Sequence, residues 1–315
     1  MILTTQSKGY AVASIVTFQR LACAFAMVCT ALLVAIPDAG ADSLDDIKAR
    51  GKLIVGVKPD YRPWGYIGPD GKLIGMEPDL AADLAQRLGV ALELVPARSA
   101  DRLDLLKAGR IDVLISTMSD TRDRRQVVTL LLPHYYSSGT NILAHKRFQF
   151  KKWDDLKGRK ICGREGAFYN RGVSVRYRAD VVVFRNNQEA KKALRDGRCA
   201  AWLSDDSTIV AELRDGDVWG EYEMPLPTED LTPWSIGLPA QDRDSALANV
   251  IATTVGEWHR SGFLIKKEKE WAALESEFLS RMHEIWTRKK DGDWLCKMVD
   301  GKANLAECNS VVPPS

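Results

Sequence analysis

Residues 109–124 read GRIDVLISTMSDTRDR, and the order of residue types in this stretch decides the fold class. The apolar run 111–115 predicts a short buried strand, and Gly109 ends a leucine-rich helix pattern over residues 100–108. A helix that leads into a buried strand is one half of a strand–helix–strand unit. The stretch therefore predicts an α/β fold in which a mainly parallel sheet is flanked by helices.

The same alternation extends in both directions along the chain. Further strands are expected at 53–57, 92–95, 160–163, 181–184 and 199–203, and further helices at 79–88 and 188–194. A strand near 234–238 and a helix over 243–260 are expected to return to the first unit. Two crossings, near 143–147 and 230–236, would form a hinge and place a ligand cleft between two lobes.

This pattern divides the chain into a leader, two lobes and an extension. We assign 42–143 and 234–271 to lobe 1, 144–233 to lobe 2, and 272–315 to a C-terminal extension packed on lobe 1. The extension carries apolar residues at helical spacing, namely Phe278, Met282, Ile285 and Trp286. They are expected to cover lobe 1, and the alternative is that they cover a partner protein.

Polar side chains come after the expected strands. Arg124 comes after the strand at 111–115, and Asp205 comes after the strand at 199–203. An arginine binds a carboxylate through two parallel charged hydrogen bonds, whereas an aspartate accepts hydrogen bonds from an ammonium group. Ligands of such folds bind at the carboxyl ends of the strands. The two groups are therefore expected to hold the two ends of a small zwitterion, which requires no catalytic residue.

The N-terminal residues 1–41 have the pattern of a secretory signal peptide. A basic start precedes an apolar stretch at 21–36 that is short for a membrane span, and the small residues 39–41 form a cleavage site. We therefore expect a cleaved leader and a periplasmic protein. The alternatives are an uncleaved membrane anchor and, less favoured, a lipid attached at Cys23.

Composition excludes some classes of partner. The chain has 44 Lys and Arg against 42 Asp and Glu, a net charge of +2, so neither nucleic acid nor an anionic membrane is an expected partner. We expect a monomer without a cofactor.

Four cysteines follow the leader: Cys162, Cys199, Cys296 and Cys308. An even number in an oxidising compartment suggests two disulfides, and four cysteines allow three pairings. Cys162 and Cys199 lie early in two expected strands and could face each other, and Cys296 with Cys308 would close a short loop. Metal binding is the rival interpretation, although no CxxC or HxxxH spacing occurs in the chain.

The order of short motifs resembles one known family. In sequence order the motifs are Gly56-Val57, Pro63-Trp64, Asp70–Gly75, Arg102 before a leucine-rich helix, Gly109–Asp112, Thr121–Arg124, the Gly166 loop, and Gly197-Arg198-Cys199 through Asp205-Asp206. Over about residues 48–271 the chain resembles the periplasmic polar amino-acid-binding proteins of ABC transporters. The resemblance implies a two-lobed type II periplasmic binding fold, no enzymatic activity, and delivery of a bound amino acid to an inner-membrane ABC permease. Cys162 and Cys199 are similar to the disulfide pair of the general and acidic amino-acid binders.

The resemblance also implies roles for individual residues. Arg124 is similar to the arginine that clamps the ligand α-carboxylate, with Thr117 and Ser119 beside it, and Asp205 to the aspartate that accepts from the α-ammonium. The alternatives are an exposed arginine at a helix start and an N-cap aspartate. Tyr61 and Trp64 correspond to an aromatic shelf over the ligand, or else to ordinary packing.

One loop departs from the pattern of the family. Hydroxyl residues usually follow the glycine, whereas this chain has Gly166-Ala167-Phe168. Backbone N–H groups at Gly166 and Phe168 could still bind a carboxylate.

Two cations predict the nature of the ligand side chain. The resemblance implies that Lys58 and Arg102 stand where acidic-amino-acid binders carry basic residues, which favours L-glutamate or L-aspartate. The alternative for Arg102 is a role in the structure of its lobe, and the alternative for Lys58 is a solvated position in a loop. Glutamine, a broad range of polar amino acids or an opine-like conjugate are the alternatives. A sensor or accessory protein that captures a ligand, and less favoured a dehydratase- or transglycosylase-like enzyme, are the rival functions.

Overall fold

The computed structural model describes residues 43–214, 216–272 and 274–312. The predicted leader, residues 1–41, lies outside this range. Within the described ranges, none of the helices is both long enough and apolar enough to cross a membrane.

Lobe 1 is built on a five-stranded sheet in the order β5-β1-β6-β14-β7. β1 pairs in parallel with β5 and β6, and β14 is antiparallel to its two neighbours. The strands of this lobe are β1 (Lys52–Val57), β2 (Asp60–Tyr61), β3 (Gly65–Ile67), β4 (Leu73–Ile74), β5 (Ala91–Pro96), β6 (Val113–Leu114), β7 (Thr129–Leu130) and β14 (Gly237–Leu238). Its helices are α2 (Ser43–Arg50), α3 (Met76–Leu88), α4 (Arg102–Lys107), α5 (Arg122–Arg125), η3 (Ala240–Asp242), α10 (Ala246–Ser261) and α11 (Phe263–Trp271).

Lobe 2 is built on a second sheet in the order β10-β9-β11-β8-β12, with β13 also paired to β8. β9 is parallel to β10 and β11, whereas β8 is antiparallel to its partners. The strands are β8 (Tyr136–His145), β9 (Lys160–Arg164), β10 (Asp180–Phe184), β11 (Ala201–Asp205), β12 (Tyr222–Glu223) and β13 (Glu229–Trp234). The helices are η1 (Lys146–Phe148), η2 (Trp153–Leu156), α6 (Tyr169–Tyr177), α7 (Asn187–Arg195), α8 (Asp206–Leu213) and α9 (Gly216–Trp219).

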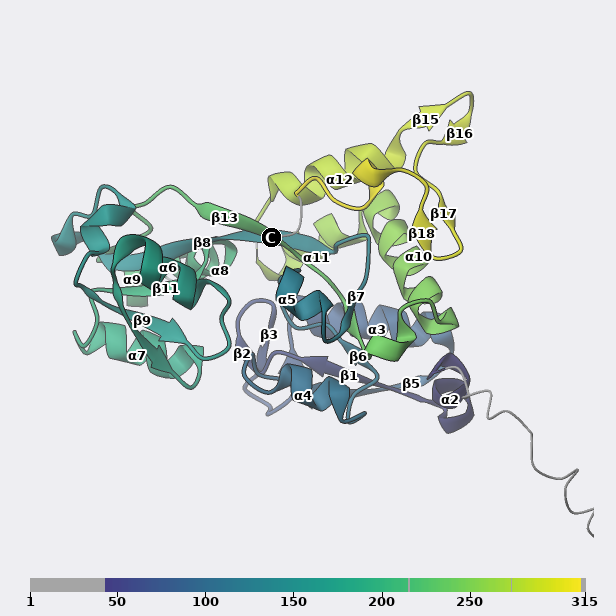
Figure 1. Cartoon of the computed structure of the whole chain (residues 1–315), viewed down its shortest axis with the longest axis horizontal. Helices are drawn as coiled ribbons and strands as arrows, with labels where there is room; N and C mark the ends of the chain where they lie inside the picture. Colours follow the sequence, from purple (N-terminus) through teal and green to yellow (C-terminus); the bar gives the residue numbers. More distant parts are fainter. Residues whose placement is uncertain (1–42, 215, 273, 313–315) are drawn as a thin grey trace, which may run out of the picture. The chain divides into compact units, whose positions relative to one another are not determined.

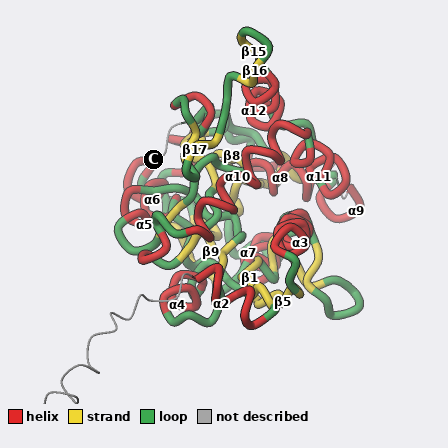
Figure 2. The backbone as a smooth tube through the Cα atoms, turned by 90° about the vertical axis from the view of Figure 1, so that its right-hand side faces the viewer, coloured by secondary structure: helices red, strands yellow, loops and turns green. Residues whose placement is uncertain are grey.

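The α/β alternation and the helices around the sheets are as predicted (Figures 1 and 2). Local signals explain where the helices begin and end. α3 ends at Gly89, whose positive φ of 70° lets its N–H bond back to the last turn. α10 begins after Ser245, whose hydroxyl accepts from the backbone N–H of Ala248.

Two strands form the hinge between the lobes. β8 and β13 pair as Tyr136 with Trp234 and Ser137 with Pro233, and the two strands run side by side in Figure 1. The chain leaves lobe 1 after β7 and is already paired in lobe 2 at Thr140, so the first crossing lies earlier than the predicted 143–147. The error has a physical cause: β8 reads YSSGTNILAH, and its polar first half is buried without an apolar pattern.

The C-terminal extension packs on lobe 1. It contains α12 (Glu277–Thr287), β15 (Lys289–Lys290), β16 (Asp293–Trp294), β17 (Met298–Val299), β18 (Lys302–Ala303) and η4 (Ala306–Cys308). The apolar residues of α12 belong to the same buried cluster as the core of α10. A Cβ atom on Gly256 would lie 2.5 Å from the ring of Trp286, so glycine allows these helices to pack closely.

Two disulfides form, one in each of the regions considered above. Cys162 on β9 is bonded to Cys199 just before β11, at a sequence separation of 37. Cys296 is bonded to Cys308 within the extension. The indole N–H of Trp286 donates to the backbone oxygen of Cys308 over 3.0 Å, which holds the tail against α12.

Candidate ligand-binding cleft

The two lobes contact each other where their strands end. Tyr61 of lobe 1 donates its hydroxyl to Asp205 of lobe 2 and lies 3.0 Å from the Ser204 hydroxyl. Arg164 of lobe 2, which lies over the Tyr61 ring, donates to the hydroxyl of Ser99 in lobe 1. Residues from two separate sheets thus meet in one cleft, as expected when ligand groups follow strand ends.

Asp205 ends β11 and is buried, with 4% of its surface exposed. It is the residue before α8, yet its carboxylate makes no capping hydrogen bond to that helix. Burial raises the pKa of the Asp205 carboxyl, and the charge of Arg164 acts in the opposite direction. A buried carboxylate that does not cap its helix is available to a cationic group in the cleft.

Arg124 lies on α5 at the edge of the cleft. Its Nη1 donates to the backbone oxygen of Ser119 over 2.9 Å, and its Nη2 approaches the backbone oxygen of Gly166 at 3.5 Å. Burial, followed by the charge of Arg164, lowers the pKa of Arg124 to about 10. Ser119 therefore positions the guanidinium through its backbone.

Lys58 and Arg164 converge on one neutral oxygen. Lys58 follows β1 and is fully buried, and its ammonium donates to the Ser99 hydroxyl that also accepts from Arg164. Burial, and next the charges of Arg164 and Arg102, lower the pKa of Lys58 well below its ordinary value. Two buried cations that share one neutral oxygen leave positive charge that an anion would match.

Arg164 is a candidate ligand-binding residue that the sequence analysis missed. It is the last residue of β9, only 4% exposed, and its Nε has no hydrogen-bond partner among the described residues. The sequence did contain a signal for Arg164, which directly follows the strand expected at 160–163. Arg124 and Asp205 were selected because they, too, come after expected strands.

Arg102 is buried close to the other cations but is bound to the backbone. Its Nη1 donates to the backbone oxygens of Ser116 and Thr117, the second over 3.2 Å. Burial and the charges of Arg124 and Arg164 lower the pKa of Arg102 well below its ordinary value. These hydrogen bonds stabilise the loop that follows β6.

Glu77 was also missed; it precedes the helix expected at 79–88, whereas in the structure it lies in the first turn of α3. It is fully buried and accepts from the backbone N–H of Thr117 and from the hydroxyl of Tyr135, both over 2.6 Å. Burial raises the pKa of Glu77 to about 7. Thr117 has a positive φ of 43°, and this carboxylate helps to hold that conformation. The Thr117 hydroxyl is buried and makes no hydrogen bond to a described residue.

The two predicted aromatic shelf residues have different surroundings. Lys58 Nζ lies 5.2 Å from the centroid of the Tyr61 ring and Arg164 Cζ lies 4.7 Å from it, so this ring is part of the cleft. Trp64 instead packs against the hinge residues Tyr136 and Trp234, with ring centroids 4.4 and 5.0 Å away. The surroundings of Trp64 are therefore those of an ordinary packed side chain, which was the alternative interpretation of this residue.

The Gly166 loop brings the lobes into close approach. Gly166 has a φ of +71°, and a Cβ atom added there would lie 2.4 Å from the backbone oxygen of Ser99. Phe168, which we predicted to contribute its N–H, packs its ring against Tyr169 and the core of lobe 2. The absence of a side chain at position 166 thus allows the observed contact between lobes.

Comparisons with known proteins agree with this architecture. Residues 53–289 match the family described as bacterial extracellular solute-binding proteins, family 3. The L-cystine-binding protein TcyJ of Escherichia coli (strain K12) is 33% identical over 234 residues, which cover 72% of this chain and 85% of that protein.

Two solved structures extend the comparison. The holo form of ArgBP from T. maritima superposes with a TM-score of 0.64 at 29% identity, covering 72% of this chain and 98% of that one. The ancestral amino acid-binding protein AncCDT-1, a precursor of cyclohexadienyl dehydratase, superposes with a TM-score of 0.64 at 26% identity, covering 73% and 99%. The family match spans well over half of the chain, and the fold is that of the type II periplasmic binding proteins. This chain therefore belongs to the bacterial extracellular solute-binding proteins, family 3.

Proposed function

We propose that this protein binds an acidic L-amino acid, L-glutamate or L-aspartate, between its lobes and delivers it to an ABC importer. The observation that carries the choice of ligand is the excess of cations in the cleft. Lys58, Arg102, Arg124 and Arg164 lie close enough to shift one another's pKa values. One carboxylate on the ligand cannot match that charge, whereas a dicarboxylic amino acid supplies two.

Each end of such a ligand has a partner in the cleft. Arg124 binds the α-carboxylate, and Asp205 binds the α-ammonium. The ammonium then replaces the Tyr61 hydroxyl as the donor to Asp205. The distal carboxylate lies between Lys58 and Arg164, where the Ser99 hydroxyl now accepts from both. From the sequence, Arg102 was expected to be the second cation that contacts the distal carboxylate. We assign this contact to Arg164 instead, because backbone oxygens hold the guanidinium of Arg102.

Closure of the lobes follows from where these groups stand. Arg124 and Lys58 belong to lobe 1, whereas Asp205 and Arg164 belong to lobe 2. A ligand that bridges the two sets gains its full contacts only when the lobes are closed, so it shifts the population toward the closed form. The closed form then docks on an inner-membrane permease on the periplasmic side and releases the amino acid there.

Two other functions remain as alternatives to import. A sensor or accessory protein would use the same cleft and present the amino acid to a different partner. An enzyme is the second alternative, since AncCDT-1 is described as the precursor of a dehydratase. Such an enzyme would need a carboxyl group able to exchange protons in the cleft. Glu77 has a suitable pKa of about 7, but Thr117 and Tyr135 already occupy one of its oxygens.

A thermal-shift screen of protein freed from bound ligand by unfolding and refolding tests the proposal. Ligand at a hundred times its dissociation constant stabilises a protein by about 2.7 kcal/mol, which gives a clear rise in melting temperature. We expect L-glutamate or L-aspartate to give the largest rise, and L-glutamine, the neutral isostere, a much smaller one.

The other outcomes separate the parts of the proposal. A rise confined to L-glutamine, L-cystine or L-arginine would retain an amino-acid receptor and remove the acidic pocket. No rise with any L-amino acid would overturn the binding function itself. Loss of glutamate over time, measured with the refolded protein, would favour the enzyme.

A further inference from the structure

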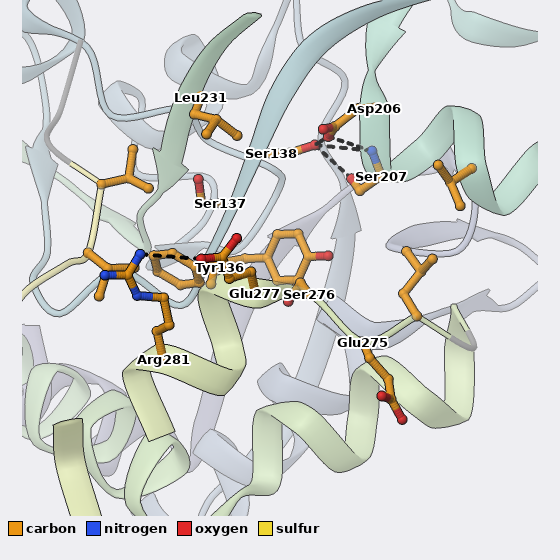
Figure 3. Close-up of a pocket in the computed structure, with 15 residues that line it drawn as sticks. Tyr136, Ser137, Ser138, Asp206, Ser207, Leu231, Glu275, Ser276, Glu277 and Arg281 are labelled. Atoms are coloured by element: carbon orange, nitrogen blue, oxygen red, sulfur yellow. Dashed lines mark hydrogen bonds and ion pairs between the residues drawn. The ribbon is translucent and has the colours of Figure 1, made fainter. Parts of the chain in front are cut away.

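A cavity lies at the hinge, outside the cleft. Its volume is about 390 Å³, which is within the range of small-molecule sites. Its walls come from the hinge strands β8 and β13, the start of α8, the start of α12 and the last described residues of the tail. Figure 3 shows these residues around the open space.

One part of the wall is polar and incompletely satisfied. Ser137 is only 7% exposed, and its hydroxyl makes no hydrogen bond to any described residue. Figure 3 shows its side chain on the wall between Leu231 and Tyr136. A buried hydroxyl without a partner costs free energy, and a ligand with a hydrogen-bonding group would recover it.

The charge of the wall indicates the type of polar group. Glu275 pairs with Lys269 at 2.9 Å, and Glu277 pairs with Arg281 at 3.3 Å. Asp206 pairs with no lysine or arginine among the described residues. Its Oδ1 accepts from the Ser138 hydroxyl over 2.6 Å and from backbone N–H groups, which leaves Oδ2 for a ligand. The unmatched charge is therefore negative, and it favours an ammonium group.

The rest of the wall is apolar. Leu231 on β13 is 55% exposed although it borders the cavity, and the side chains of Val210, Phe278, Val311 and Val312 complete this part of the wall. Burial of a hydrocarbon body against these side chains would be favourable by about 25 cal/mol for each Å² removed from water. The cavity thus combines an apolar wall with one unmatched carboxylate.

The location of the cavity connects it to lobe closure. Asp206 and Ser207 belong to α8, directly after the cleft residue Asp205, and they move with lobe 2. Phe278 belongs to the extension, which packs on lobe 1. Any change in the angle between the lobes must therefore change the distance between these walls. A molecule that fits the cavity in the closed protein stabilises that closed form.

We propose that this hinge cavity is a binding site for a small amphipathic amine, whose ammonium group binds Asp206 and whose apolar body packs on Leu231 and Phe278. Occupation of the site raises the affinity of the cleft for its amino acid. The binding part stands by itself, whereas the coupling part rests on the proposed function.

Calorimetric titration of the purified protein with 2-phenylethylamine tests the binding part, with 3-phenylpropionate as the probe of opposite charge. We expect saturable binding of the amine only. Asp206→Asn should weaken it by about tenfold or more, as expected for loss of a charged hydrogen bond. Asp217→Asn is the matched control, because it removes an exposed aspartate of lobe 2 that does not line the cavity.

A second pair of variants tests the cavity itself. Val210→Trp, which fills the cavity, should abolish amine binding, whereas Val175→Trp, on the exposed face of α6, should not.

Asp205→Ala separates this site from the cleft, because Asp205 is the cleft group that would bind an ammonium. Retained amine binding in that variant supports the hinge site, and its loss there would place the amine in the cleft and overturn the proposal. Equal affinity in wild type and Asp206→Asn, equal binding of the acid, or no saturable binding at millimolar amine would also overturn it.

The coupling part has its own readout. Saturating amine should lower the dissociation constant of L-glutamate by about fivefold, the lower end of usual allosteric effects, and glutamate should improve amine binding by the same factor. Unchanged glutamate affinity with the amine bound would overturn the coupling. Absence of glutamate binding with intact amine binding would contradict only the proposed function.

Discussion

The guanidinium carbon of Arg164 lies 4.7 Å from the centroid of the Tyr61 ring, so a cation of lobe 2 rests on an aromatic ring of lobe 1. The same ring donates its hydroxyl to Asp205, two strands away from Arg164 in sequence order. The ring thus lies between the two charged groups that lobe 2 contributes. This relationship makes Arg164 the first residue to test.

Replacement of Arg164 by glutamine should weaken glutamate binding by roughly ten- to a hundredfold, because a hydrogen bond to a charged group contributes about 1.5–3 kcal/mol. Calorimetric titration measures the change. Arg159→Gln, an exposed position just before β9, is the matched control. If both variants bind like the wild type, the distal carboxylate is not held by Arg164.

Arg124 and Asp205 should separate the two ends of the ligand. Arg124→Ala should abolish amino-acid binding while the protein stays folded, and Asp205→Ala should weaken it by at least about 2 kcal/mol. Glutarate, which lacks the ammonium, should bind wild type and Asp205→Ala more equally than L-glutamate does. The titrations are paired with circular dichroism of each variant. Wild-type affinity in Arg124→Ala would remove the carboxylate clamp.

The disulfide of lobe 2 should matter for both stability and binding. In the chain-entropy model, a loop of 37 residues contributes about 4 kcal/mol to the free energy of unfolding. Cys162→Ser with Cys199→Ser should therefore lower that free energy and also weaken glutamate binding, because the bond ties together the strands that end in Arg164 and Asp205.

The extension provides the comparison for that pair. Cys296→Ser with Cys308→Ser opens a shorter loop and should cost about 3 kcal/mol in the same model. It should leave the glutamate affinity unchanged, since the loop contributes no group to the cleft. Urea denaturation and calorimetry measure both quantities. Equal loss of affinity in the two double variants would contradict a specific role for the lobe 2 bond.

His259 should make the protein less stable in acid. Burial lowers its pKa to about 4 from the ordinary 6.5, and its Nε2 bonds to the backbone oxygen of His134. The unfolded chain binds a proton between pH 6.5 and 4 that the folded protein does not. The contribution of this residue is therefore complete above pH 6.5 and is lost as the pH falls to 4, by about 3 kcal/mol.

His259→Gln should remove that dependence while keeping a donor for the carbonyl. Urea titrations at pH 7.5 and pH 4 give the free energy of unfolding, and the variant should lose about 3 kcal/mol less than the wild type between them. His145→Gln, at a partly exposed position, should follow the wild type. Identical pH dependence in all three proteins would show that His259 does not titrate in this way.

The strands, helices and family could be predicted because local patterns determine them. Apolar runs and glycine stops located most elements, and the positions of Lys58, Arg124 and Asp205 after strands made them candidates for the cleft. The start of β8 was missed because residues such as Ser137 and Thr140 are polar and yet buried between partners on both sides. Periodicity in sequence carries no signal for a strand of that kind.

The finer features of the site depend on contacts between distant residues. Glu77 lies in a helix that also shows an apolar stripe, and only the fold brings its carboxylate to Thr117, 40 positions later. Arg102 looked like a ligand group, but its fixed hydrogen bonds to Ser116 and Thr117 depend on the tertiary fold. Trp64 was predicted to lie over the ligand or to pack in the core. Its neighbours in sequence do not show that it packs against Tyr136 and Trp234 of the hinge.

Gly166 has a consequence for how long a captured molecule stays. Because even a methyl group there would collide with the backbone of Ser99, the size of this residue limits how closely the two lobes can approach at this point. The methyl group of Gly166→Ala would keep the two lobes slightly farther apart. Such a protein would still admit its ligand at the normal rate but would release it sooner, so position 166 is a place where residence time can be adjusted without altering a single charge.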